Sequence, residues 1–115
     1  MVIAAAIEVH RQLGPGLLES TYEECLCREL PIRKIPFERQ KNLALDYKGL
    51  HVEVAYRMDL VIDKKVVLEM KCCETIAKVH EAQLLTYLRL SRIKAGLILN
   101  FSEASMTKGI RRMIL

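Results

Sequence analysis

Two carboxylates and a lysine are spaced in this sequence so that one β-hairpin would bring them together. Residues Asp63–Lys65 separate two short apolar runs, which is the pattern of a turn between two strands. If the hairpin is symmetric about Lys64, Asp59 lies directly opposite Glu69, with Cβ atoms about 5 Å apart. Lys71 follows Glu69 by two residues, so the pleat of the strand turns both side chains to the same side.

The chemistry that this spacing favours is metal-assisted hydrolysis. Two opposed carboxylates can hold a divalent cation through their oxygens. A lysine beside them can orient a water molecule or stabilise a phosphoryl transition state. The alternative is a set of cross-strand salt bridges on an exposed sheet face, which are common and stabilise a protein by only about 0.2–1 kcal/mol each. The hairpin spacing by itself leaves both interpretations open.

The elements that must position these residues follow from periodicity and turn signals. Helices are predicted over Val2–Leu13, from about Leu18 to Leu30 and over Val79–Ser91. Strands are predicted over Phe37–Tyr47, Leu50–Ile62, Val66–Cys72 and Ala95–Phe101. A Gly-Pro-Gly break ends the first helix and Pro31 is expected to end the second. The tail Met106–Leu115 is compatible with a short helical turn and an edge strand. The order predicts an α/β fold with a mixed sheet flanked by helices.

Length and composition predict one soluble domain, residues 1–115, with 51% hydrophobic residues for its core. No apolar run approaches the length needed to span a bilayer, and the N-terminus lacks the features of a signal peptide, so a cytoplasmic location is expected. The net charge of +4 is compatible with a polyanionic partner, although no basic tail is present. Aromatic residues make up only 5%, which argues against extensive base stacking.

The four cysteines are predicted to be buried or half-buried thiols in a reducing compartment. They are Cys25, Cys27, Cys72 and Cys73. Neither pair has the spacing of a zinc knuckle, and the four do not match a typical iron–sulfur run.

Three motifs in chain order resemble the PD-(D/E)XK nuclease superfamily. The core signature is Asp59 followed by Glu69-Met70-Lys71. Gly16–Tyr22 is similar to the G-x-x-E-x-x-Y motif that names a bacterial family of this superfamily, and Gln83–Tyr87 is similar to the Q-x-x-x-Y motif of RecB-like nucleases. The resemblance extends over nearly the whole chain. It implies a restriction-endonuclease-like core of order αβββαβ, with a central mixed sheet between helices.

The resemblance also implies roles for individual residues. The catalytic set would be Asp59, Glu69, Lys71 and Glu19. The ligands of a Mg²⁺ or Mn²⁺ ion would be Asp59, Glu69, Glu19 and the backbone carbonyl of Met70, and Lys71 would position or help to deprotonate a water molecule. The residues expected to orient the site or the substrate are Gln83, Tyr87, Tyr22, Arg57 and His80.

Some of these residues also have ordinary structural explanations. Glu19 is an acid in a first helical turn, where the helix dipole favours it. Gln83 and Tyr87 could form a solvated stripe on an amphipathic helix, and His80 is balanced between a site wall and an ordinary surface histidine. Arg57 could contact a phosphate or pair with a nearby glutamate, Glu69 or Glu53.

The predicted function is a Mg²⁺- or Mn²⁺-dependent deoxyribonuclease that cleaves phosphodiester bonds in DNA with a metal-activated water. Because a fold does not prove a function, the alternative is a non-catalytic nucleic-acid- or protein-binding module that retains the nuclease fold. Hydrolysis of another phosphoester is a third, weaker alternative. A chain of 115 residues is close to a bare core, so a homo-oligomer or a protein partner for productive DNA binding is left open.

Overall fold

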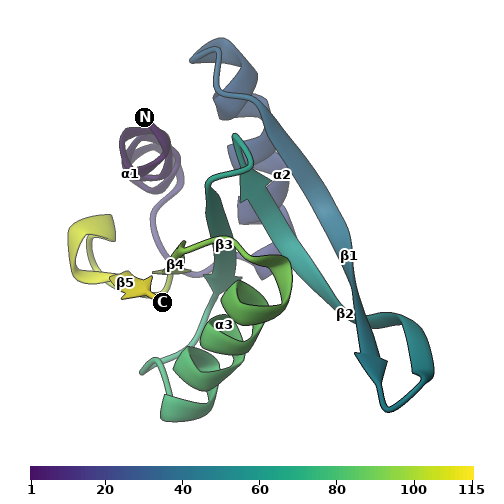
Figure 1. Ribbon diagram of the computed structural model, residues 1–115. Coiled ribbons are helices and arrows are strands. Elements are labelled where there is room, and N and C mark those ends of the chain that lie inside the picture. Colours follow the sequence, from purple (N-terminus) through teal and green to yellow (C-terminus); the bar gives the residue numbers. More distant parts are fainter.

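The computed structural model describes all residues, 1–115, as one five-stranded mixed sheet with helices on both faces (Figure 1). The strands are β1 (Phe37–Tyr47), β2 (Leu50–Ile62), β3 (Val66–Lys71), β4 (Ala95–Asn100) and β5 (Ile110–Ile114). The helices are α1 (Val2–Leu13), α2 (Glu19–Ile32) and α3 (Lys78–Ser91), with a short 3₁₀ turn, η1 (Met106–Lys108). The predicted α/β class and element order are confirmed.

The strands lie in the sheet in the order in which they occur in the chain. β1, β2 and β3 form an antiparallel meander, and β4 pairs parallel to β3 because α3 carries the chain back across the sheet. β3 and β4 are central, and most of their residues are buried on both faces, as their apolar sequences predict. β5 pairs antiparallel to β4 and forms one edge.

Two apolar clusters hold the layers together. On one face, α1 and α2 pack over Leu60, Leu68 and Leu99. On the other face, α3 packs over Val67 and Ile98. α3 lies so close to β4 that a Cβ atom at Gly96 would meet a Leu84 methyl carbon at 2.9 Å, so any larger residue there would force Leu84 to move. The carboxyl end of β3 is therefore enclosed between α2 and α3.

The structure differs from the sequence-based prediction at several boundaries. β3 and β4 each end one residue earlier than predicted, and α3 begins one residue earlier, at Lys78. α2 continues past Pro31 and ends at Ile32. This is tolerated because Pro31 lies in the last turn, where the N–H groups of Arg33 and Lys34 still bond to helix carbonyls. The tail, which the sequence left undecided, forms η1 and the edge strand β5.

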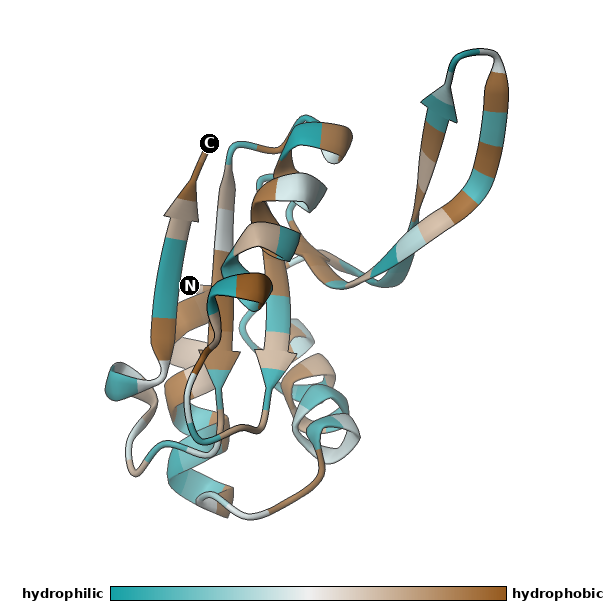
Figure 2. Cartoon of the chain, turned by 90° about the horizontal axis from the view of Figure 1, so that it is seen from below, coloured by the Kyte–Doolittle hydropathy of each residue, from teal (hydrophilic) through white to brown (hydrophobic).

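β1 and β2 are about twice as long as the other strands, and their distal part projects from the body (Figures 1 and 2). We call residues 44–55 the arm. Its turn is Lys48-Gly49, as predicted, and both residues have left-handed backbone conformations, with φ of 46° and 87°. A register shift between Leu43 and Leu45 marks the root of the arm. The arm accounts for the elongated shape of the molecule, 48 × 31 × 23 Å.

Candidate active site

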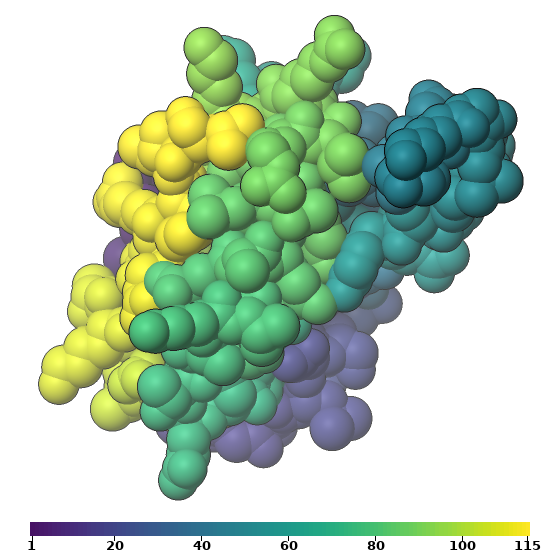
Figure 3. Space-filling model, turned by 60° about the horizontal axis from the view of Figure 1, so that its bottom comes forward, coloured from purple at the N-terminus to yellow at the C-terminus, as the bar shows by residue number.

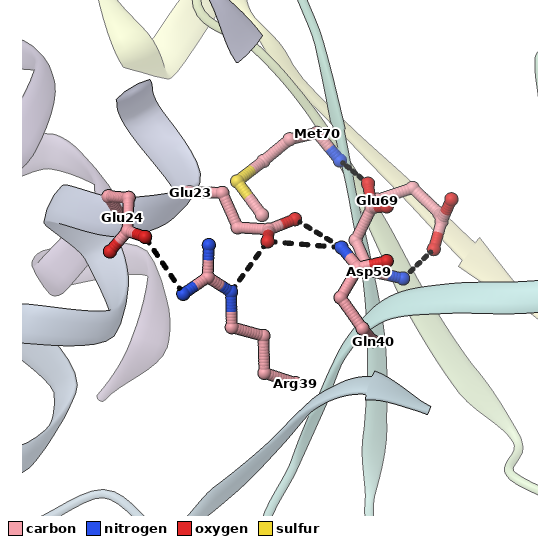
Figure 4. A network of polar contacts seen from close by, with 7 residues as sticks. All are labelled: Glu23, Glu24, Arg39, Gln40, Asp59, Glu69 and Met70. Carbon is pink, nitrogen blue, oxygen red and sulfur yellow. Dashed lines mark hydrogen bonds and ion pairs between the residues drawn. The ribbon is translucent and has the colours of Figure 1, made fainter. Parts of the chain in front are cut away.

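The predicted hairpin has the predicted register, and it ends where the two carboxylates begin. Leu60 pairs with Leu68 in the last rung of the β2–β3 ladder. At the next position, the backbone N–H of Asp59 donates to a Glu69 carboxylate oxygen at 2.9 Å, and the N–H of Met70 donates to an Asp59 carboxylate oxygen at 2.9 Å. The side chains thus replace the strand-to-strand hydrogen bonds at the point where the strands separate (Figure 4).

Burial of these two carboxylates makes their negative charge costly. Glu69 is only 8% exposed, and burial together with the nearby Asp59 charge raises the pKa of Glu69 to about 8. Burial also raises the pKa of Asp59. The Lys71 charge lowers both pKa values, but it does not cancel the effect of burial. A pair of this kind is a place where a divalent cation would relieve the cost of two buried charges.

Glu19 approaches the pair from α2. It is the first residue of α2, and its carboxylate accepts the backbone N–H of Cys72 at 3.0 Å, just beyond the end of β3. An open hollow of about 430 Å³ lies in front of it. The hollow is lined by Leu18, Glu19, Ser20, Glu23, Gln40, Asp59 and Met70. The fold therefore brings Glu19 and Asp59 to one hollow, with Glu69 directly behind Asp59.

A third acid of the hollow, Glu23, was not among the predicted site residues. Its side chain is buried, and both carboxylate oxygens accept hydrogen bonds from the Gln40 amide, at 2.8 and 3.0 Å. Arg39 pairs with the same carboxylate at 2.7 Å and reaches Glu24 at 3.2 Å (Figure 4). Glu23 lies four residues after Glu19, on the same helix face, and this spacing was the available signal.

Gln40 reaches Glu23 because the backbone of β1 is distorted at this point. Its φ of 53° places a non-glycine residue in the left-handed region. The ladder between β1 and β2 pairs Arg39 with Leu60 and Lys41 with Met58 but skips Gln40, which stands opposite Asp59. An interruption that costs about 1–3 kcal/mol persists only where its surroundings enforce it, and such positions cluster at functional sites.

The residues of the Q-x-x-x-Y motif lie on the α3 side of the carboxylates. Tyr87 is buried, and its ring packs on Tyr56 of β2 with centroids 4.6 Å apart. Burial raises the pKa of Tyr87, as do a hydrogen bond to the Tyr56 hydroxyl and the nearby charge of Glu69. Gln83 donates its amide N–H to the same Tyr56 hydroxyl. Tyr56 therefore joins both motif residues, a role that no spacing in the sequence indicated.

The structure corrects the expected place of Tyr22. Its ring is buried and stacks on Phe101 at 4.4 Å, so it points into the core and does not line the hollow. Its hydroxyl donates to the Gly14 carbonyl and accepts the N–H of Leu17 at 3.1 Å. Tyr22 thereby shapes the loop that leads into α2 and Glu19. Tyr22 and Glu19 are three residues apart on the helix, but this spacing did not reveal that Tyr22 packs in the core while Glu19 lines the hollow.

Arg57 and His80 have local partners. The Arg57 guanidinium is exposed and donates to the Asn42 side-chain oxygen at 3.1 Å, and it pairs with neither of the two glutamates considered from the sequence. His80 accepts the backbone N–H of Ala77 through Nδ1 at 3.1 Å. It therefore closes the first turn of α3, and it does not line the hollow.

The carboxylates do not converge into a preformed metal centre. No group of three or more His, Cys, Asp or Glu side chains is close enough to hold an ion. The physical reason is that Glu19, Asp59 and Glu69 are each held by a different backbone N–H group. All four cysteines are free and half-buried, as predicted.

Comparison with known families matches this arrangement to one superfamily. A family model described as the PD-(D/E)XK nuclease superfamily matches residues 1–113. The chain belongs to this superfamily. No curated protein and no solved structure matches the chain. Membership in the PD-(D/E)XK superfamily suggests a nuclease and, with it, nucleic-acid binding. No helix of the protein is long and apolar enough to cross a membrane.

Proposed function

We propose that this chain is a single-domain, divalent-metal-dependent nuclease of the G-x-x-E-x-x-Y family that hydrolyses phosphodiester bonds in DNA. The observation that carries the proposal is the position of Asp59 and Glu69 at the point where β2 and β3 separate, with Glu19 across the hollow. This geometry brings a carboxylate from α2 to the β2–β3 hairpin, which lies far from it in sequence. An ordinary cross-strand salt bridge would not need the third carboxylate.

The donor set fits Mg²⁺ or Mn²⁺. The residues that would hold the ion are Asp59, Glu69 and Glu19, with the Met70 carbonyl as a further ligand, and all of these donors are oxygen atoms. The elevated pKa values of Asp59 and Glu69 indicate that the pair lacks a sufficient counter-charge in the protein alone. When bound, the ion lowers the pKa of a water molecule and stabilises negative charge on the scissile phosphate.

Residues of the chain would hold the water and the substrate in place. Lys71 follows Glu69 on β3, and no carboxylate lies within ion-pair distance of its amino group. It would donate a hydrogen bond to the attacking water or to a phosphate oxygen. The Tyr87 hydroxyl is protonated at neutral pH, as in any tyrosine, and the raised pKa extends this to higher pH, so it would act as a hydrogen-bond donor beside the carboxylates.

The other predicted residues would act at the margin of the site. Gln83 would hold Tyr87 through the shared Tyr56 hydroxyl. The exposed Arg57 guanidinium would contact a substrate phosphate. His80 and Tyr22 would position α3 and α2 respectively.

A non-catalytic binding module is the second candidate. The absence of a converged group of metal ligands favours it. The two candidates differ in what the carboxylates must do, because a nuclease needs the charges of Asp59 and Glu69, whereas a binding module needs only their hydrogen bonds. An Asp59→Asn substitution keeps the shape of the side chain and removes the charge, so it separates the two.

The test is cleavage of labelled single-stranded, double-stranded and branched DNA in the presence of Mg²⁺, Mn²⁺ or EDTA. Wild type is compared with Asp59→Asn and Lys71→Ala, and Lys64→Ala in the exposed hairpin turn is the matched control. We expect cleavage by wild type and by the control, and none by the two site variants or with EDTA. Cleavage that persists in Asp59→Asn would contradict the proposal.

Calorimetric titration with Mn²⁺ tests the ligand set separately from cleavage. We expect binding to wild type and a loss of binding in Asp59→Asn. A folded wild type that binds DNA without metal, with equal affinity in Lys71→Ala, would instead identify a binding module.

A further inference from the structure

One face of the arm is apolar and uncovered. Leu45 pairs with Val52, and Tyr47 pairs with Leu50, so these four side chains lie on the same face. Tyr47 and Leu50 are 59% and 61% exposed. Figure 2 shows the alternation of apolar and polar residues along the arm. A two-stranded ribbon is marginal in water by itself, and an exposed apolar patch of this kind marks an interaction surface.

An open groove lies between the root of the arm, at Tyr56, and α3. At the arm root, Leu43 pairs with Tyr56, and Leu43 belongs to the cluster under α3. The groove, about 240 Å³, is lined by Tyr56, Val79, Ala82, Gln83, Thr86 and Tyr87, none of which is charged. Val79 is 60% exposed. The arm stands out from the body beside α3 (Figure 3). One chain therefore carries both the projecting arm and an uncharged groove.

The charges of the arm favour a protein over a nucleic acid as the occupant. On the opposite face, the His51 ring contacts Asp46 at 2.6 Å and Glu53 at 3.1 Å. Lys48 is the sole lysine or arginine in residues 44–55. The arm therefore has no excess of positive charge with which to attract phosphates, although the chain as a whole carries +4. Apolar contact surfaces that are rich in tyrosine and poor in charge are typical of the core of protein interfaces.

The area of the face is consistent with a reciprocal interface between two copies. Since an aromatic side chain covers about 150–250 Å², the exposed apolar side chains of the arm present on the order of 400 Å². A stable interface buries about 800 Å² per partner, roughly twice that amount. An arm laid on a flat surface would fall short of this area. Two arms, each lying in the groove of the other copy, bury arm and groove on both chains.

We propose that this chain forms a two-fold homodimer in which the apolar face of each arm packs over the groove between the arm root and α3 of its partner. The contact pairs the apolar arm face of one copy, where Lys48 Nζ at the tip lies 5.4 Å from the Tyr47 ring centroid, with the uncharged groove of the other. Because net charge is concentrated elsewhere, two copies of a chain with charge +4 can approach at this face without strong repulsion.

Sedimentation equilibrium of the full chain over a range of concentrations tests the proposal. We expect the mass of wild type to rise towards twice 13.2 kDa. The arm variant Tyr47→Ser/Leu50→Ser and the groove variant Val79→Asp should each weaken dimerisation by about tenfold or more. All three positions are exposed, so folding is expected to survive, and circular dichroism verifies it. The matched control is Ile32→Ser/Ile114→Ser, which removes equally exposed apolar side chains outside the arm.

Two outcomes would overturn the dimer. One is a wild type that stays monomeric throughout. The other is a dimer whose dissociation constant is unchanged by both the arm and the groove substitutions. A monomer whose affinity for a labelled single-stranded oligonucleotide falls on Tyr47→Ser/Leu50→Ser would instead assign the face to nucleic acid. Mass is measured without metal or cleavage, so this result is independent of the proposed nuclease function.

Discussion

The two ends of β2 both carry large aliphatic side chains but have very different surroundings. At the carboxyl end, Leu60, Val61 and Ile62 are buried between helices on both faces. At the amino end, Leu50 is mostly exposed, because β1 is its sole neighbour and no helix covers the arm. The same kinds of side chain therefore serve as core in one half and as surface in the other. The burial that holds the core end together also raises the pKa of Asp59.

The largest expected effect is on catalysis at the buried end. Lys71→Ala and Asp59→Asn should each reduce kcat by at least about 10²–10³-fold, because each removes a group that stabilises developing charge. Lys48→Ala in the arm turn should leave kcat within twofold. Single-turnover cleavage of labelled DNA measures the difference. A loss in Lys48→Ala as large as that in Lys71→Ala would show that the arm belongs to the catalytic site.

Leucine-to-alanine substitutions at the two ends of β2 should differ in their effect on the free energy of unfolding. Leu60→Ala should lower the free energy of unfolding by about 2–5 kcal/mol, because it leaves a cavity in a fully buried position. Leu50→Ala should change it by less than about 0.5 kcal/mol in the monomer. Urea denaturation at low protein concentration measures both. A cost at Leu50 close to that at Leu60 would mean that the arm is covered in solution.

The pH dependence of stability tests the buried carboxylate pair. The folded-state pKa of Glu69, about 8, lies above its unfolded value, so the folded protein holds the extra proton. Without metal, stability should therefore be greatest below about pH 4.5 for this group and should fall as the pH rises towards 8, by on the order of a few kcal/mol. Glu69→Gln should flatten this part of the profile and stabilise the protein at pH 8.

Thermal melting in EDTA across this pH range provides the measurement. Mg²⁺ should restore much of the stability of wild type at pH 8, because the cation favours the ionised carboxylates, and it should have little effect on Glu69→Gln. A wild-type profile that runs parallel to that of Glu69→Gln between pH 5 and pH 8 would contradict the raised pKa of Glu69.

The smallest expected effect on kcat is at Tyr56, which lies on β2 between the arm and the buried carboxylates. Tyr56→Phe removes the hydroxyl that holds Gln83 and Tyr87 but keeps the ring packing. Loss of a hydrogen bond worth about 1 kcal/mol should lower kcat by roughly fivefold to tenfold, with little change in KM. Thr86→Val is the control, because Thr86 lines the same groove but its hydroxyl donates to the Ala82 carbonyl. A change in KM alone would place Tyr56 in substrate binding instead.

Local features of the sequence were sufficient to predict most of the fold. The Asp63–Lys65 turn and the Lys48-Gly49 turn set the register of both hairpins, because turn geometry and alternation act over a few residues. The limits of α1 were also predicted, because a Gly-Pro-Gly break stops a helix wherever it packs. The prediction that Pro31 ends α2 was wrong by a short distance, because a proline in the last turn of a helix removes only one hydrogen bond.

Residues whose roles depend on distant partners could not be predicted in the same way. Glu23 needs Arg39 and Gln40 from another element, and the distorted backbone of Gln40 has no sequence signal. Tyr56 acquires its role only because α3 folds back over β2. Tyr22 and Glu19 have the spacing of neighbours on a helix, yet Tyr22 is buried in the core and Glu19 lines the hollow.

The sequence by itself determined the elements, their order and the opposition of Asp59 to Glu69, because turn residues and alternation encode these over short distances. Only the tertiary structure decided that the two strands separate at these residues, that Glu19 reaches them from α2, and that the arm is left uncovered. The physical reason is that burial depends on which elements pack together, and burial sets both the pKa of a carboxylate and the exposure of an apolar face.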